Sequence, residues 1–386
     1  MLLKEDVIET GIPVCIYDSI GDIDPLSWDQ LKPGIPFYQS HLFLSVIEQL
    51  HPGLQFRYVT VKKDDKLIAL FYLQLLDFAL RNLLNYSQES KGIKKAIKQY
   101  FAKKNAKLLN LGDVFFTGDK GIISLDESEA VLLLPEIFKH VKKTFPTSPN
   151  AYLVANIYLE DQEKCISFCN SAFHPFITEP DMFLSVDPAW KTFDDYMNAL
   201  SSKYRVRARK VLNLSKHITR RELSLSEIIA QKPELNILYN NVVNHVAFNM
   251  AVLDIRFFEV MKELYGDSCK VCGYFDESGR MLGFCCLFHI DPSTLHVHYI
   301  GLNYEANTTF KLYNRMLLDF VDFAIERKVQ KVHFGRTATE IKSTIGAQAY
   351  PLQAYLKMNS GLINIALPYL LKRIKPQGYT VRNPFK

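Results

Sequence analysis

Charged side chains follow an apolar segment near residue 335. Residues 329–334 alternate between apolar and polar types, which predicts a half-buried strand, and Arg336, Glu340 and Lys342 come directly after it. The two cations are suited to a phosphate or carboxylate ligand, with Glu340 orienting one of them or acting in catalysis. The alternative is an exposed, salt-bridged strand end, which contributes little to stability. Loops at strand ends often carry function, so we favour the ligand role.

Histidine and tyrosine side chains in residues 294–302 are candidates for proton transfer. A period of two places His296 and His298 on one face of the predicted strand and Tyr299 on the other. A histidine acts as a base near neutral pH, and Tyr299 either packs or donates a proton. The alternative is that His296, His298 and His333 are only cross-strand neighbours on a half-buried sheet face. His298 and Tyr299 join Glu340 as catalytic candidates.

A basic helix is predicted near residues 193–216. Its later part carries Lys203, Arg205, Arg207, Arg209 and Lys210, and Arg205 and Arg209 share one helical face. Guanidinium groups bind phosphates in a bidentate manner, so these two arginines are candidate phosphate ligands. The alternative is a solvated helix surface.

Composition places the chain among globular proteins. It has 386 residues, enough for two domains, with 48% hydrophobic and 23% charged residues and a net charge of +5. Nucleic-acid binding usually requires a more concentrated basic surface. The first residues lack the basic and apolar regions of a signal peptide, and no segment reaches 18 apolar residues, so a cytoplasmic protein without a transmembrane segment is expected. The oligomeric state is not readable.

The cysteines include two close pairs, Cys269-x-x-Cys272 and Cys285-Cys286. Close pairs are typical of zinc sites. However, adjacent strand residues point to opposite faces, and Cys285 and Cys286 lie in the apolar segment MLGFCCLFHI. Buried cysteines that act as small apolar residues are therefore expected, and no metal site is predicted.

The chain contains an internal duplication. Two strand–turn–strand units, at 56–76 and 269–290, are each followed by an amphipathic helix and a strand, at 129–161 and 310–337. A short helix and an aromatic strand then complete each copy, at 164–177 and 340–356. The predicted fold class is α+β: two tandem domains, 1–180 and 181–386, each with a mixed, mostly antiparallel sheet flanked by helices. The first copy also holds a lysine-rich insertion at 91–107, and the apolar helix after residue 360 is expected to dock on the second domain.

The repeated order resembles the acyl-CoA N-acyltransferase (GNAT) fold, and two copies joined by a basic helix resemble tandem-GNAT proteins of the Fem-like and polysaccharide-associated group. The segments that carry this resemblance are LSSKYRVRARK (200–210) and the Phe-Gly-Arg…Glu-x-Lys…Gly pattern of residues 334–346. It covers most of residues 40–358. It implies a cleft where strands 294–302 and 330–335 separate, with Asn249 and Tyr313 in the substrate cleft and Arg336 and Lys342 binding phosphate.

The resemblance also implies a reaction: transfer of an acyl group from an acyl-CoA-type donor to an amine of a small polar or cell-envelope-related acceptor. The glycine-rich pyrophosphate loop of CoA-dependent relatives is missing, because residues 302–311 contain no glycine and no helix opens directly after Gly118 and Gly121. Two alternatives follow. One is a Fem-like transferase that takes its acyl group from an aminoacyl-tRNA, and the other is an inactive binding module. Fold analogy alone does not choose among them.

Overall fold

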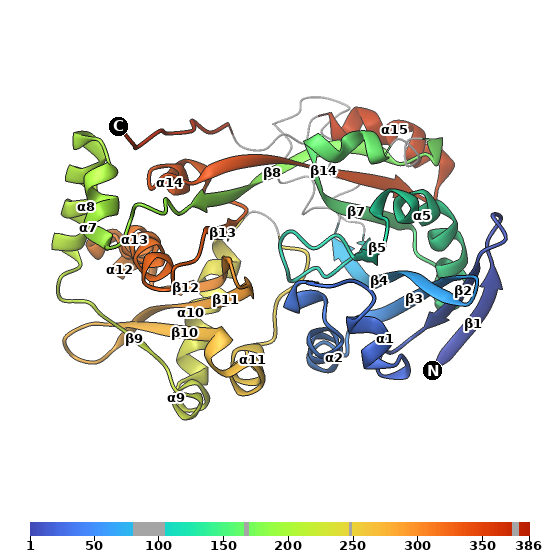
Figure 1. Ribbon diagram of the computed structural model, residues 1–386, viewed down its shortest axis with the longest axis horizontal. Coiled ribbons are helices and arrows are strands. Elements are labelled where there is room, and N and C mark those ends of the chain that lie inside the picture. The colour runs from blue at the N-terminus through green and yellow to red at the C-terminus, as the bar shows by residue number, and fades with distance from the viewer. Residues whose placement is uncertain (80–104, 166–169, 247–248, 373–377) are drawn as a thin grey trace. The chain divides into compact units, whose positions relative to one another are not determined.

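The computed structural model describes residues 1–79, 105–165, 170–246, 249–372 and 378–386. The chain forms two compact units, which we call the first and second units (Figure 1). The first comprises Met1–Glu179, Ala247–Ala251 and Pro351–Gln377; the second comprises Pro180–Val246, Val252–Tyr350 and Gly378–Lys386. The expected division after residue 180 lies next to the first of these boundaries, whereas 247–251 and 351–377 cluster with the first unit. The lysine-rich insertion lies outside the described residues, except for its last three, which begin a strand.

The first unit contains a long mixed sheet. Its elements are β1 (Leu2–Val7), β2 (Pro13–Tyr17), α1 (Pro25–Asp29), α2 (His41–Leu50), β3 (Gln55–Lys63), β4 (Lys66–Ala79), β5 (Asn105–Leu111), β6 (Ile122–Ser124), α5 (Glu127–Val141), β7 (Ala151–Tyr158) and α15 (Gly361–Leu371), with short 3₁₀ turns at Ile20–Asp22, Phe37–Gln39, Lys142–Thr144 and Leu159–Cys165. The strand order is β1-β2-β3-β4-β5-β7-β14, with β6 beside β4. Strand β14 (Gln348–Met358) arrives from the far end of the sequence.

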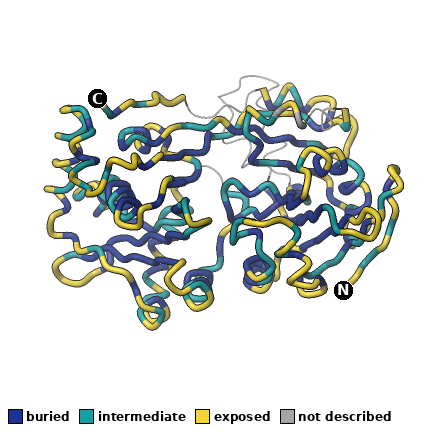
Figure 2. The backbone as a smooth tube through the Cα atoms, viewed as in Figure 1, coloured by how far each residue is buried: buried dark blue, intermediate teal, exposed yellow. Residues whose placement is uncertain are grey.

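Apolar side chains on both faces of this sheet account for its burial. Helix α5 places Leu134 and Ile137 on one face, in a cluster with Val59, Phe71 and other strand residues. On the other face, Leu367 and Leu371 of α15 pack in a second cluster with residues of β4, β5, β7 and β14. The prediction that this C-terminal helix docks on the second domain is therefore wrong. Figure 2 shows the central strands as buried and the turns as exposed.

The second unit repeats the plan. Its elements are α7 (Phe193–Ala199), α8 (Ser202–Leu214), β9 (Thr219–Glu222), α9 (Leu225–Ala230), α10 (Lys232–His245), α11 (Phe257–Tyr265), a 3₁₀ turn (Gly266–Ser268), β10 (Cys269–Phe275), β11 (Met281–Asp291), β12 (Thr294–Leu302), α12 (Tyr304–Phe310), α13 (Leu312–Glu326), β13 (Lys331–Gly335) and α14 (Thr339–Ser343). Strand β8 (His174–Ser185) crosses from one unit into the other, and its last residues pair with β13. The strand order is β8-β13-β12-β11-β10-β9.

The duplication explains most of this architecture. The series β3-β4-β5-α5-β7 corresponds to β10-β11-β12-α13-β13, and in each unit the strands on either side of the helix are parallel: β5 with β7, and β12 with β13. All other strand pairs of these series are antiparallel. The sheets are thus mixed and mostly antiparallel, which confirms the predicted α+β class.

The last strand of each copy is exchanged. The strand expected to complete the first copy, β8, pairs through Met182–Ser185 with β13 of the second unit. The strand expected to complete the second copy, β14, pairs through Leu352–Met358 with β7 of the first unit. Both copies have the same final strand, so an exchange satisfies the same sheet hydrogen bonds and leaves no local sequence signal.

Candidate functional site

Strands β12 and β13 separate after a short parallel contact. Their pairing runs from Thr294 opposite Lys331 to His296 opposite His333, whereas β12 continues to Leu302. A cavity of about 180 Å³ lies at the point of separation, enclosed by α10, β12, α13 and residues 334–342. Beyond His296, β12 no longer pairs with β13, and residues 297–300 line the cavity.

A β-bulge determines which side chains of β12 reach the cavity. Cys286 of β11 lies opposite Tyr299, and the next residue, Leu287, lies opposite Val297, so His298 has no counterpart in the register. A bulge redirects the side chains around it. As a result, His298 and Tyr299 both line the cavity. The predicted placement of these two residues on opposite faces is wrong, because regular alternation fails at the bulge.

A row of buried polar groups lies next to the cavity, since the ring of His296 is 5.5 Å from that of His298 in the cavity wall. The Oδ1 atom of Asp181 is 2.7 Å from Nε2 of His333, and Nδ1 of His333 is 2.8 Å from Nδ1 of His296. Asp181 is fully buried, and both imidazoles are at most 4% exposed. A buried carboxylate requires such partners, since burying an unpaired charge is costly.

The hydrogen bonds of this row connect three buried side chains. The imidazole of His333 has Nε2 next to the carboxylate of Asp181 and Nδ1 next to Nδ1 of His296. Burial, together with His333, lowers the pKa of His296 well below its usual value, and burial lowers the pKa of His298 to about 3. The imidazoles of His296 and His298 are therefore neutral at physiological pH.

Two tyrosine side chains also line the cavity. Tyr299 and Tyr313 line the cavity, and the ring of Tyr239 meets that of Tyr299 edge-on at 5.4 Å. Burial raises the pKa of Tyr313, so its phenol stays protonated. Tyr313 lies in the first turn of α13, where its backbone N–H donates to Oδ1 of Asn307 at 2.8 Å. Asn307 thus satisfies one N–H group at a helix end that has no glycine loop.

The charged cluster after β13 separates into different roles. Arg336 lines the cavity and is half-buried. The ammonium of Lys342 also reaches the cavity wall, but it donates to the carbonyl oxygens of Phe334, Gly335 and Arg336 at 2.6–3.1 Å. These contacts hold the end of β13 in place. Glu340 does not line the cavity: it is exposed and pairs with Arg382.

Three other predicted residues do not line this cavity. Arg205 and Arg209 are on α8, where Arg209 is exposed and Arg205 half-buried, and neither lines the cavity. Asn249 belongs to Ala247–Ala251, which clusters with the first unit. The structure therefore brings together His298, Tyr299, Tyr313, Arg336 and Lys342. Sequence reasoning missed Asp181, whose partner His333 lies 152 residues further along the chain.

The corresponding point of the first unit is bridged by a loop. Strands β5 and β7 pair as far as Leu111 opposite Val154. Just beyond, Nδ2 of Asn156 donates to the carbonyl oxygen of Asp119 at 2.7 Å. Gly112 and Gly121 lie so close that a Cβ atom on Gly121 would be 2.2 Å from the backbone nitrogen of Gly112. The loop of residues 112–121 is thus packed against its own ends.

Asp119 organises this loop. Its carboxylate accepts hydrogen bonds from Tyr72, from Gln39 at 3.1 Å, and from the backbone N–H groups of Asp113 and Gly121 at 2.6 and 3.0 Å. Burial and the neighbouring Asp119 raise the pKa of Asp113 to about 7, and burial also raises the pKa of Asp119. In the first unit, buried polar groups therefore hold a loop where the second unit has a cavity.

The four cysteines of the two close pairs lie in strands, as expected from their apolar surroundings. Cys269, Cys272, Cys285 and Cys286 are buried free thiols of β10 and β11, with Cys272 opposite Cys285. Within the described ranges, no group of three or more His, Cys, Asp or Glu side chains is arranged to hold a metal ion. Over the same ranges, no helix has the length and apolar character needed to cross a membrane.

Solved structures resemble this chain, although no family model and no curated protein matches its sequence. A tandem GNAT protein from the clavulanic acid biosynthesis pathway, solved without AcCoA, aligns with a TM-score of 0.51 at 10% identity, over 90% of this chain and 99% of that chain. FemX aligns with a TM-score of 0.48 at 12% identity, over 79% of this chain and 89% of FemX. L-PGS from Bacillus licheniformis aligns with a TM-score of 0.48 at 10% identity, over 91% of this chain and 98% of L-PGS.

The match to the tandem GNAT protein identifies the fold. Its TM-score is the one of the three above 0.5, and it spans nearly the whole of both chains. The protein therefore has a tandem GNAT fold, which confirms the resemblance stated from the sequence. At this level of identity the likeness concerns the fold alone.

Proposed function

We propose that the second unit transfers a short acyl group from an acyl-CoA-type donor to an amine of a small polar or cell-envelope-related acceptor. The observation that carries this proposal is the cavity where β12 and β13 separate, with His298, Tyr299 and Tyr313 in its wall and the Asp181–His333–His296 row next to it. The first unit, with its loop bridging the same point, is proposed to have no donor site.

The proposed reaction uses side chains that already have the required protonation. The acceptor nitrogen attacks the thioester carbonyl, a C–N bond forms and the C–S bond breaks. His298, whose low pKa makes it a weak base, relays the proton lost by nitrogen instead of keeping it. Backbone N–H groups of β12 beyond His296 stabilise the oxyanion, the phenol of Tyr299 or Tyr313 protonates the leaving thiolate, and the relayed proton restores that phenol. Asp181 acts as a positioning residue through His333.

The size of the cavity supports a short acyl group. Its volume of about 180 Å³ is below the roughly 300–1,000 Å³ typical of sites that enclose a whole small-molecule ligand. It therefore suits the reacting end of a donor, with the remainder outside. Arg336 at the cavity wall is proposed to contact a donor phosphate, and Lys342 to hold the strand end from which Arg336 projects.

Helix α8 favours a second candidate, an aminoacyl-tRNA donor. Lys203, Arg207, Arg209 and Lys210 are exposed on this helix, and within the described residues they form no ion pair. Unpaired cations on one helix are suited to phosphate contacts, whose strength falls steeply with salt. This candidate requires Arg205 and Arg209 to bind RNA, whereas the acyl-CoA proposal requires neither.

A cavity-blocking variant tests the acyl-CoA proposal. Val242 lines the cavity from α10 and is half-buried, so V242W fills the site while leaving the strands intact. Ile237 lies on the same helix, is 55% exposed and does not line the cavity, so I237W is the matched control. With acetyl-CoA and a panel of amino sugars, amino acids and polyamines, we expect amine-dependent thiol release by the wild type and I237W but not by V242W. Equal release by all three, or none by the wild type, contradicts the proposal.

A further inference from the structure

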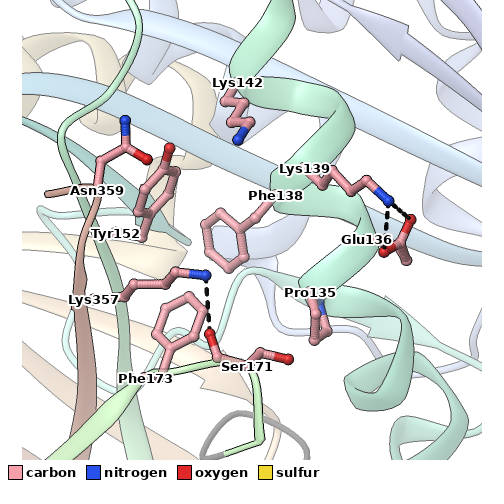
Figure 3. A pocket seen from close by; sticks show the side chains of 10 residues that line it. All are labelled: Pro135, Glu136, Phe138, Lys139, Lys142, Tyr152, Ser171, Phe173, Lys357 and Asn359. Carbon is pink, nitrogen blue, oxygen red and sulfur yellow. Dashed lines mark hydrogen bonds and ion pairs between the residues drawn. The ribbon is translucent and has the colours of Figure 1, made fainter. Parts of the chain in front are cut away.

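A second cavity, of about 330 Å³, lies within the first unit. It is bordered by α5, β7, the residues just before β8, and the end of β14 (Figure 3). Lysine side chains and aromatic rings gather around it: Lys139, Lys142, Lys357, Phe138, Tyr152 and Phe173. Its volume is within the range of sites that enclose small ligands, about 300–1,000 Å³. No step of the proposed acyl transfer uses it.

Lys139 is already neutralised by carboxylates. Its Nζ atom lies 2.5 Å from Glu9 and 3.4 Å from Glu136. Figure 3 shows Lys139 and Glu136 directed toward each other rather than toward the rings. Glu136 is therefore engaged with Lys139 rather than with Lys142 or Lys357, and Glu9 and Glu136 together carry one charge more than Lys139.

Lys142 and Lys357 are not neutralised in this way. Within the described part of the chain, the ammonium of Lys142 forms no ion pair, and that of Lys357 donates to the carbonyl oxygen of Ser171 at 2.9 Å. Both side chains point into the space beside the rings (Figure 3). Burial, and after it the charge of Lys142, lowers the pKa of Lys357. Two like charges thus border one cavity, and within the described residues neither forms an ion pair with a carboxylate.

Helix electrostatics accounts for only one of these cations. Lys142 follows the last residue of α5, and the C-terminal end of a helix attracts positive charge. Lys357 comes from β14, more than two hundred residues later, and is half-buried rather than extended into solvent. Bringing a second, partly desolvated ammonium to the same cavity is unfavourable unless an anion compensates it.

The aromatic rings at the cavity indicate what kind of group would accompany the anion. Phe138 and Phe173 are 4% and 2% exposed, and their centroids are 5.6 Å apart. Their edges and faces form an apolar wall next to the lysines (Figure 3). Tyr152 and Asn359 add polar groups on the opposite side. Both rings also pack in the apolar cluster of the first unit, and the ring edges that reach the cavity favour a ligand with a flat apolar part over a bare inorganic anion.

We propose that this cavity binds a soluble phosphate monoester with an aromatic body. The dianionic phosphate lies between the ammonium groups of Lys142 and Lys357, and its charge balances both. The aromatic body packs against Phe138 and Phe173. This site belongs to the first unit and is independent of the proposed transfer reaction in the second.

Phenyl phosphate is the probe for this site. Calorimetric titration of the full chain is carried out at about pH 8, where the phosphate is a dianion because its second pKa is near 6. We expect saturable binding of phenyl phosphate that is at least about tenfold tighter than that of inorganic phosphate or benzoate, since each of these lacks one half of the recognition. Binding of either comparison ligand as tightly as phenyl phosphate overturns the proposal, as does the absence of saturable binding.

A matched pair of variants locates the binding. Lys142 is replaced in K142Q, and its exposed neighbour Lys143, which does not line the cavity, in K143Q. Both changes remove one positive charge, and melting curves verify that both variants are folded. We expect K142Q to weaken phenyl phosphate binding about tenfold, the effect of losing one charge-assisted hydrogen bond, and K143Q to change it less than twofold. Equal weakening by both indicates nonspecific attraction and overturns the proposal.

Discussion

The two units share one plan but differ where their parallel strands separate. In the second unit, β12 and β13 diverge around a cavity lined by His298 and Tyr299. In the first unit, the same point is bridged by residues 112–121, held by the carboxylate of Asp119. A duplicated fold thus provides two equivalent positions, and the chain uses buried polar groups at both. At one, polar groups lie next to a cavity; at the other, they hold a loop in place.

This difference indicates how a duplicated fold can divide its roles. A loop that satisfies its own buried polar groups stabilises a unit and leaves little room for a substrate. A strand pair that separates early leaves backbone groups available to bind a substrate. We therefore propose a stabilising role for the polar cluster of the first unit and a positioning role for that of the second.

The largest expected effect tests the loop of residues 112–121, which bridges the separating strands of the first unit. In G121A, the new methyl group would meet the backbone of Gly112, and the residue would also keep a φ of +68°. Overpacking and a left-handed backbone together cost about 2–5 kcal/mol. Hydrogen exchange of β4 and β5 amides in urea measures this loss.

Gly11, in the same unit, supplies the control for G121A. It has a φ of +78°, but no atom lies within 4 Å of the position that a Cβ would take, so G11A should cost only about 1–2 kcal/mol. Equal effects of the two variants would show that the close packing of the loop does not contribute to the stability of the first unit.

The next effect tests the cavity of the second unit, where β12 and β13 separate. D181N keeps the shape of the side chain but removes the charge that orients His333. If this row positions the site, kcat for acyl transfer should fall about 100-fold with little change in KM for the donor, in line with the loss of general acid–base catalysis. Steady-state kinetics gives both parameters. A rise in KM at unchanged kcat would mean that Asp181 serves donor binding instead.

A smaller effect concerns the pH dependence of the first unit. The pKa of Asp113 is raised to about 7 in the folded state, so the folded chain binds this proton more tightly than the unfolded chain. The stability that this proton contributes is complete below about pH 4 and is lost as pH rises to about 7. The free energy of unfolding of D113N should therefore vary less over this interval than that of the wild type. Parallel curves for the two proteins would contradict the assignment.

The smallest effect separates the two donor classes. Replacing both Arg205 and Arg209 by glutamine should change kcat/KM with acetyl-CoA less than about twofold, because neither residue lines the cavity. An aminoacyl-tRNA donor would instead lose affinity with each phosphate contact removed, and the salt dependence would become less steep. Filter binding of tRNA at two salt concentrations distinguishes these outcomes.

Local patterns made the plan of the fold predictable, whereas long-range contacts did not. The turns and helices of both copies follow from alternating strands, polar hairpins and helical periodicity. The exchange of β8 and β14 does not, since two equivalent strands give the same local signal. Among site residues, His298 and Tyr299 were identified by type, but the bulge that turns both toward the cavity depends on the register with β11. Asp181 had no local signal, because its role arises only from pairing with His333.

The central claim is that the chain has one donor site and that this site is in the second unit. Calorimetric titration of CoA into the wild type, V242W and I237W tests it most directly. We expect one CoA bound per chain for the wild type and I237W, and none for V242W. Two CoA molecules per chain, or undiminished binding to V242W, would place a donor site outside the cavity of the second unit and contradict the account.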